Sequence, residues 1–310
     1  MATTQIILSL IKLFLMIIPG FLLSKANVID DHQSKAISSL IVNVTWPCLI
    51  VISLQRDFSK ELCINMGILA LTMVLAIVIA FVLARIVSKF IEMPPSIMYL
   101  ITFMFMFGNT GFMGIPVCTA LYGSEGTFYA ALIDCVQDIF IFTVGLVIIE
   151  KSTGKHIGFS PKQFLTPGFG SIVIGLGLFV AGIHLPSVIY VPVETVGAAT
   201  SPLAMIVIGY QLGKLSFKEL VGDGRLYVMS AVRLLVIPCI FLGLVLLIFP
   251  EMTILTKVIV VEMATPVAAV TTIYSQQYDG DVGFATKGVM LSTVLALVTL
   301  SAFAVIVEMI

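Results

Sequence analysis

Five ionisable side chains stand inside long apolar stretches of the sequence, namely Lys12, Asp134, Asp138, Arg233 and Glu262. Each lies near the middle of its stretch, where an isolated charge in a bilayer costs at least ~2.5 kcal/mol. Such groups must pair, face water or be neutral, so they suit the binding of ions and the carriage of protons. No nucleophile–base pair and no cluster of metal ligands accompanies them in the sequence, so we expect neither an enzyme nor a metal site.

Asp134 and Asp138 are four residues apart and therefore share one face of a helix. Two close carboxylates favour the binding of a proton to one of them, so this face is a candidate for proton or ion coupling. The alternative is a structural ion pair with Lys12 or Arg233.

Arg233 is a candidate ligand for a substrate carboxylate, which a guanidinium binds through two parallel hydrogen bonds. The alternative is a salt bridge to a carboxylate of another span. Glu262 lies four residues before Pro266, on the last turn of an expected helix. It either borders the same site and takes part in ion coupling, or satisfies backbone or lysine partners.

Two apolar stretches are interrupted by helix-breaking residues, "GNTGFMGIPV" at 108–117 and "ATPV" at 264–267. Irregular backbone at membrane depth is tolerated only where it is buried in protein or lines a wet cavity. Proline fits the first position of a helix, so we expect Pro116 and Pro266 each to begin a second half-helix. The positive ends of these half-helices would then converge and attract an anion. Neutral hydrogen-bonding groups at the breaks come from Asn109, Thr110 and Thr265. The alternative is a pair of proline kinks that serve packing alone.

The elements that hold these residues are long apolar helices. Of the 310 residues, 59% are hydrophobic and 11% are charged, a composition that soluble domains of this size do not have. The first apolar run is not a cleavable signal, because no basic residue precedes it and Lys12 interrupts it. We predict an all-α membrane protein with ten transmembrane helices, at residues 4–23, 35–54, 61–84, 96–122, 127–149, 167–183, 195–213, 225–249, 254–278 and 284–307.

The chain repeats its own pattern. Thr45 and Pro47 in the second span match Thr200 and Pro202 in the seventh, and the interruption of the fourth span matches that of the ninth. We therefore predict two five-helix repeats, residues 1–150 and 167–310, joined by a short cytoplasmic loop at 151–166. Because five is odd, the second repeat is inserted with opposite polarity, and the broken helices 4 and 9 are expected to cross. Inverted repeats with paired breaks are typical of secondary transporters.

The distribution of basic residues predicts the orientation of the chain. Odd-numbered connections carry Lys25, Lys35, Arg85, Lys89, Lys151, Lys155, Lys162, Lys214, Lys218, Arg225 and Lys287, whereas even-numbered ones carry Arg56, Lys60 and Lys257. Because basic loops stay in the cytoplasm, we predict a multi-pass protein of the cell membrane with both termini outside.

Several of these segments resemble the auxin efflux carrier family, which includes plant auxin carriers and prokaryotic permeases for malate and malonate. The segments are "VTWPCLI", "GNTGFMGIPV", "SPLAMIVIGYQLG", "VRLLVIPCI" and "EMATPVAAVTTIYSQQYDGD", in this order along the chain. The resemblance implies a scaffold domain, a transport domain with crossed broken helices and elevator-type alternating access. It implies that Pro116 and Pro266 are the crossover prolines and that Asn109 binds substrate. The short central loop differs from that of plant carriers and favours a short organic acid over auxin.

The sequence thus predicts a secondary transporter of organic anions, with the lipid bilayer and a small anion as partners, no nucleic acid, and a homodimer as a further hypothesis. No cofactor is expected beyond coupling to H⁺ or Na⁺. One alternative is a cation/proton antiporter with Asp134 and Asp138 as its ion site. Another is a sodium-dependent organic-anion symporter, in which the ends of the first half-helices hold Na⁺.

Overall fold

The computed structural model describes residues 2–156, 165–214 and 222–310, and every regular element in these ranges is helical. Seven helical stretches are long and apolar enough to cross a membrane by length and composition, and two shorter apolar helices span Pro95–Met106 and Pro167–Ala181. The prediction of an all-α membrane protein with several apolar spans is therefore confirmed. Most of the predicted loop 151–166, residues 157–164, lies outside the described residues.

The helices before residue 157 are often interrupted by short π-helical turns. Their bounds are α1 Ala2–Leu15, α2 Ile17–Lys25, α3 Asp31–Leu40, η1 Ile41–Thr45, α4 Trp46–Ser53, α5 Lys60–Phe90, α6 Pro95–Met106, η2 Thr110–Gly114, α7 Ile115–Phe140, η3 Ile141–Gly145 and α8 Leu146–Thr153. Within α7 the chain turns back at Gly123, whose φ of 60° is a left-handed conformation that glycine adopts without steric cost. The helix α7 therefore contains the end of one predicted span and the start of the next.

The helices after residue 164 follow a similar pattern. Their bounds are α9 Pro167–Ala181, α10 Ser187–Ala198, α11 Thr200–Gly213, α13 Gly224–Ala231, η5 Val232–Val236, α14 Ile237–Ile248, α15 Ile254–Met263, α16 Val270–Gln277 and α17 Val282–Met309. The gap between α15 and α16 contains Pro266 and matches the gap between α6 and η2.

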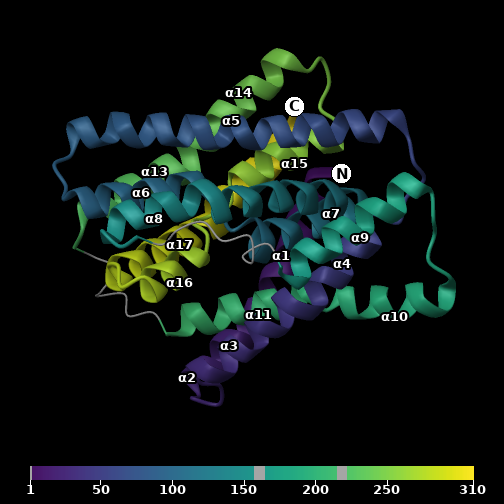
Figure 1. Cartoon of the computed structure of the whole chain (residues 1–310), viewed down its shortest axis with the longest axis horizontal. Coiled ribbons are helices and arrows are strands. Elements are labelled where there is room, and N and C mark those ends of the chain that lie inside the picture. Colours follow the sequence, from purple (N-terminus) through teal and green to yellow (C-terminus); the bar gives the residue numbers. More distant parts are fainter. Residues whose placement is uncertain (1, 157–164, 215–221) are drawn as a thin grey trace.

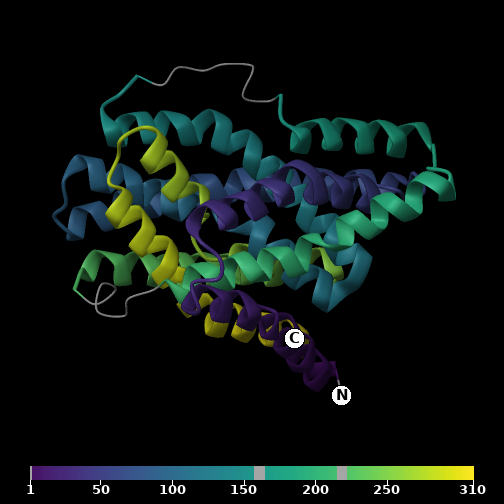
Figure 2. The same cartoon turned by 90° about the horizontal axis from the view of Figure 1, so that it is seen from below.

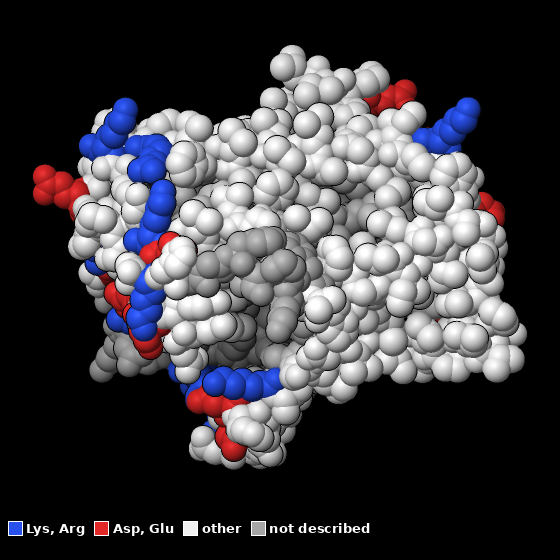
Figure 3. Space-filling model, in the orientation of Figure 1, with Lys and Arg blue, Asp and Glu red and all other residues white. Residues whose placement is uncertain are grey.

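The surface is apolar where helices face outward. On α5 one side buries Leu69 and Met73 in the protein, while Leu71 and Val78 on the other side are exposed. A helix that is apolar all round suits a position between a protein core and lipid. In Figure 3 the charged side chains gather along the left and lower edge and at the upper right, and the described residues of the broad surface between them carry none.

The helices pack in two groups. A small group contains α2, α3, α4, α9, α10 and α11, and a large group contains α5 to α8 and α13 to α17. The helix α1 lies against α7 and α17 of the large group and also touches α2. Figure 1 shows α2, α3, α10 and α11 along the lower side of the molecule. Figure 2 shows the two chain ends close together, where α1 lies beside the end of α17.

Glycines allow the closest helix contact of the small group. A Cβ added at Gly20 of α2 would overlap the carbonyl of Ile206 on α11, and one added at Gly209 would overlap the carbonyl of Ile17 on α2. Small residues let two membrane helices approach through their backbones, which strengthens their van der Waals packing. The α2–α11 pair is therefore a tight contact within this group.

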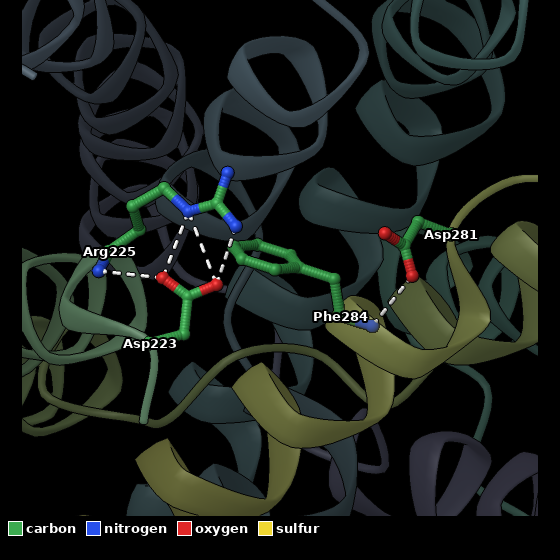
Figure 4. A network of polar contacts seen from close by, with 4 residues as sticks. All are labelled: Asp223, Arg225, Asp281 and Phe284. Atoms are coloured by element: carbon green, nitrogen blue, oxygen red, sulfur yellow. Dashed lines mark hydrogen bonds and ion pairs between the residues drawn. The ribbon is translucent and has the colours of Figure 1, made fainter. Parts of the chain in front are cut away.

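Two helices of the large group begin side by side, each capped by its own aspartate (Figure 4). Asp223 accepts a hydrogen bond from the Arg225 backbone N–H at 3.0 Å and a second from the Arg225 guanidinium at 2.6 Å. Asp281 accepts from the Phe284 N–H at 2.8 Å, and the Arg225 guanidinium lies 5.3 Å from the centre of the Phe284 ring. The Arg225 guanidinium holds the pKa of Asp223 below its usual value. These contacts tie the start of α13 to the start of α17.

Candidate functional site

The two interrupted helices meet at their interruptions. Gly108 and Val267 form an antiparallel bridge, in which the Asn109 N–H donates to the Pro266 carbonyl at 2.8 Å and the Ala268 N–H donates to the Phe107 carbonyl at 3.0 Å. In Figure 1, α6 and α7 lie almost end to end, with α15 above and α16 below their level. Two short extended segments, far apart in sequence, thus satisfy each other's backbone groups deep inside an apolar protein.

The second half-helices do not begin at the prolines. The first begins as the π-helical turn η2, because the Asn109 carbonyl accepts from the N–H groups of Met113 and Gly114. Pro116 lies in the first turn of α7, after η2, and Pro266 lies in the extended segment before α16 begins at Val270. The expectation that each proline starts a half-helix is therefore wrong for Pro266, while Pro116 stands at the start of only the α-helical part of its half-helix, after the turn η2. Pro266 cannot donate a backbone hydrogen bond, so it fits an extended segment in which its carbonyl alone is used.

At each interruption, a polar side chain from a packed helix forms hydrogen bonds with backbone groups that the broken helix leaves without partners. Gln137 of α7 accepts a hydrogen bond from the Gly108 N–H at 3.0 Å and donates to the Gly108 carbonyl at 2.9 Å. Ser292 of α17 accepts from the Val267 N–H at 3.2 Å. Both side chains are buried, and they contact the two residues that form the bridge. Buried backbone groups need partners of this kind once a helix is broken.

The side chain of Asp134 lies beside the turn η2, where the helix resumes after the first interruption. Its Oδ1 atom accepts a hydrogen bond from the Thr110 hydroxyl, and Thr110 in turn accepts from Gln137 Nε2 at 2.7 Å. Asp134 and Thr110 are 5% and 1% exposed, respectively. Asp138 is half-buried and interacts electrostatically with Asp134. The two aspartates thus share one face as predicted, but Asp134 alone of the two is bonded to the interruption.

Arg233 lies beside the second interruption. Its Nη2 donates to the Thr265 hydroxyl at 3.2 Å and its Nη1 to the Phe105 carbonyl at 3.4 Å, whereas its Nε has no hydrogen-bond partner in the described part of the chain. The residue is 3% exposed, and no carboxylate of the described chain lies within 4.0 Å of it. The alternative of a salt bridge to another span is therefore not observed. A buried cation without a carboxylate partner is costly and calls for another anion.

Glu262 is fully buried next to the first half-helix. Its Oε1 accepts from the Cys118 thiol at 3.6 Å, and its Oε2 has no hydrogen-bond partner in the described chain. The alternative of a lysine partner is not observed, and neither is a pairing of the aspartates with Lys12, since Lys12 is exposed on α1 and forms no ion pair with a described residue. Glu262 interacts electrostatically with both Arg233 and Asp134.

Three glycines of the first interruption each make room for one of these ionisable side chains. A Cβ at Gly108 would overlap the Arg233 guanidinium, and one at Gly114 would overlap the Glu262 carboxyl. A Cβ at Gly111, between them in sequence, would come within 3.1 Å of Asp134 Oδ2. Gly108 and Gly114 therefore allow ionisable side chains to approach the backbone closely, and Gly111 leaves little spare room beside Asp134. The sequence pattern alone does not indicate this role.

The structure brings together around the bridge Asn109, Thr110, Thr265, Pro266, Arg233, Asp134 and Glu262. Pro116 lies farther along the chain, after η2, in the first turn of α7. Asn109 is 7% exposed, and its side chain forms no hydrogen bond with another described residue. Gln137 and Ser292 were missed by the sequence analysis. Gln137 carried a usable signal, because it lies three residues after Asp134 and shares its helix face in an apolar stretch. No group of metal-binding side chains is present among the described residues.

An all-helical membrane protein that concentrates its polar groups at paired helix interruptions has the form of a membrane transporter. The chain belongs to the family described as "Membrane transport protein", the auxin efflux carrier family, whose profile matches residues 5–161 and 158–304. The two matched stretches meet in the connection between the predicted halves, which suggests a repeat. The predicted resemblance is confirmed, and the chain is a membrane transporter and not an enzyme.

Two archaeal relatives align over almost the whole chain. An uncharacterized transporter of Methanothermobacter thermautotrophicus is 27% identical, and the alignment covers 99% of each protein. An uncharacterized transporter of Methanocaldococcus jannaschii is 24% identical, and the alignment covers 93% of this chain and 94% of the relative.

Proposed function

We propose that this transporter carries short organic anions across the cell membrane, and that the substrate carboxylate binds where the two interruptions meet. The observation that carries the proposal is Arg233, a buried guanidinium beside the second interruption with an unpartnered Nε and no carboxylate within 4.0 Å in the described chain. The side chain of Asn109, which has no hydrogen-bond partner among the described residues, adds a hydrogen-bond donor at the same place. The start of α16 adds the partial positive charge of a helix N-terminus.

The same geometry supports a proposal for the arrangement of the chain in the membrane. We propose ten transmembrane helices in two inverted five-helix repeats, residues 1–150 and 167–310, with broken helices 4 and 9 crossed at the Gly108–Val267 bridge. The repeat interpretation is supported by the matching gaps, and by the satisfaction of each gap from the last helix of its own half through Gln137 or Ser292. The loop 151–166 joins the repeats.

The two packing groups suggest how the site is exposed to each side in turn. The residues of the site all belong to the large group, whereas the small group contains the tight α2–α11 pair. We propose that the small group is the scaffold and that the large group is the transport domain. One rigid movement of the transport domain would carry the site across the bilayer in an elevator-type cycle. The exposed apolar faces meet lipid, and a second copy of the chain is a further proposed partner.

The proposed orientation places both termini outside and is tested by cysteine labelling. Two exposed residues mark the ends of corresponding helices in the two halves. Lys89 lies near the end of α5, and Glu251 follows the end of α14. In a variant without native cysteines, we expect Glu251→Cys to react with a membrane-impermeant maleimide in intact cells. Lys89→Cys should react only after permeabilisation. Reaction of both from the same side would contradict the inverted arrangement.

The substrate class is tested by thermal stability of the purified protein. A ligand that binds only the folded state at 100 times its Kd stabilises that state by about 2.7 kcal/mol, so binding raises the melting temperature. We expect malate, malonate or a similar acid to raise it, and chloride at equal ionic strength to leave it unchanged. If none of a panel of mono- and dicarboxylic acids raises the melting temperature of monodisperse protein, organic anions are excluded as substrates.

The same screen separates the alternative functions. Stabilisation by an acid only when Na⁺ is present would indicate a sodium-dependent organic-anion symporter. Stabilisation by a cation or by pH alone, with no effect of any acid, would indicate the cation/proton antiporter, for which the paired face of Asp134 and Asp138 is the supporting observation.

A further inference from the structure

A chain of hydrogen bonds joins the first interruption to a buried carboxyl. Gln137 contacts both the N–H and the carbonyl of Gly108, and its Nε2 lies 2.7 Å from the Thr110 hydroxyl oxygen. The Thr110 hydroxyl contacts Asp134 Oδ1. All of these residues are buried, so water does not compete for the bonds.

The direction of each bond is determined by chemistry. The backbone N–H of Gly108 can only donate, so the Gln137 atom beside it is the acceptor Oε1, which determines the orientation of the amide. Gln137 Nε2 therefore donates to Thr110, and the hydroxyl hydrogen of Thr110 points to Asp134 Oδ1. Because Oδ1 already accepts the Thr110 hydrogen, we assign a bound proton to Oδ2, which accepts no hydrogen bond from a described residue.

Asp134 Oδ2 faces the start of the first half-helix. It lies beside Gly111, where a Cβ would stand 3.1 Å away. Among the described residues, the charged or titratable groups that interact with Asp134 are Asp138 and Cys135 of its own helix and Glu262 of α15. Arg233 of η5 interacts with Glu262, and Tyr274 of α16 interacts with Asp138. Within the described ranges, carboxyl groups thus outnumber cationic side chains around the interruptions, where Arg233 is the one cation.

We propose that Asp134 carries the proton that is coupled to anion transport, and that Gln137 and Thr110 are positioning residues that transmit its charge state to the interruption. The inference rests on the proposed function, because it concerns the same anion site. An ionised Asp134 repels an anion at the interruption through a low-dielectric interior, and a proton on Oδ2 removes that repulsion. By linkage, the anion then favours proton binding as much as the proton favours anion binding.

The transport step needs no further reactant. One proton from the solution on the first side binds Asp134 Oδ2 and forms an O–H bond, and the anion binds at the interruption. Both cross the membrane together, and the O–H bond breaks again when the proton is released on the second side. The carrier then returns without anion and with Asp134 ionised, as at the start of the cycle.

The test uses the purified full chain in proteoliposomes with radiolabelled malate and malonate as probes. Exchange of labelled for unlabelled acid at equal pH measures binding and movement, while accumulation driven by an inwardly directed proton gradient measures coupling. We expect Asp134→Asn to lower exchange by about threefold and gradient-driven accumulation by at least tenfold. A purely structural role of Asp134 would lower both by the same factor.

Further variants test the positioning residues. Thr110→Val, which keeps the shape but removes the hydroxyl, is expected to reduce accumulation by at least tenfold, and Thr110→Ser should restore it. Thr143→Val is the matched control, because the Thr143 hydroxyl bonds only to carbonyls of its own helical stretch and faces outward. It should behave as wild type in both assays. Gel filtration shows whether each variant is folded.

The outcomes separate this inference from the proposed function. If the wild-type protein exchanges neither acid, and its melting temperature responds to none, the proposed function and the inference fail together. If the wild type exchanges an acid but does not accumulate it on a proton gradient, or does so only on a Na⁺ gradient, the inference alone fails. It also fails if Asp134→Asn accumulates normally, or if Asp138→Asn uncouples transport in its place.

Discussion

Alanine at Gly108 or Gly114 is expected to abolish acid binding and transport and to lower the melting temperature of the purified protein. The added Cβ at Gly108 would overlap the Arg233 guanidinium and the Thr265 hydroxyl, and at Gly114 it would overlap the Glu262 carboxyl. Overpacking a dense core costs typically 1–3 kcal/mol, and here the displaced atoms belong to buried ionisable groups with few partners. The measurements are binding of malate by calorimetry and exchange in proteoliposomes.

Glycines elsewhere in the chain provide the control. Gly67 in α5 and Gly177 in α9 have open space where a Cβ would be added. Alanine is favoured over glycine in a helix by roughly 0.5–1 kcal/mol, so Gly67→Ala and Gly177→Ala should leave transport unchanged and stability equal or higher. Normal transport by Gly114→Ala would show that Glu262 is not held against the interruption.

Gln in place of Arg233 is expected to weaken the binding of dicarboxylates much more than that of monocarboxylates. The start of α16 and the Asn109 amide serve one carboxylate, and a second needs the guanidinium. A hydrogen bond to a charged group contributes ~1.5–3 kcal/mol, so the loss is on the order of ten- to a hundredfold in Kd for diacids. Calorimetry with matched acids, such as malonate and acetate, measures the difference.

Arg225→Gln is the matched control for this variant, because Arg225 pairs with Asp223 at the start of α13, away from the interruptions. It should change the binding of both acids equally, if at all. Equal weakening of both acids by Arg233→Gln, in protein that elutes normally on gel filtration, would contradict the assignment of Arg233 to the second carboxylate.

The interruptions could be predicted because helix breakers are conspicuous in an apolar run. A cluster of Gly, Asn, Thr and Pro at membrane depth is stable only where it is buried in protein or lines a wet cavity. The sequence alone therefore indicates the residues around Asn109 and Thr265 as a candidate site. The residue at which the helix resumes after the first interruption could not be predicted. The proline signal points to Pro116, but a π-helical turn begins earlier, at Thr110. Local propensity indicates where a helix is broken more reliably than where it resumes.

The pairing of the interruptions depends on contacts that periodicity does not encode. The bridge from Gly108 to Val267 and the bonds from Gln137 and Ser292 join residues distant in sequence. A salt bridge of Arg233 to another span, which charge alone offered as the alternative to substrate binding, is not formed among the described residues. The fold places its guanidinium on the Thr265 hydroxyl and a carbonyl, which no count of charges reveals.

The central claim is that an organic anion binds where the two interruptions meet, and Asn109 tests it most directly. Its side chain lies in the first interruption, is buried, and forms no hydrogen bond with another described residue. The measurement is equilibrium binding of malate and malonate to wild type and to Asn109→Ala by calorimetry. Saturable binding by the wild type, at least tenfold weaker in Asn109→Ala, is the predicted result. Equal affinity of the two proteins for these acids would contradict the placement of the site.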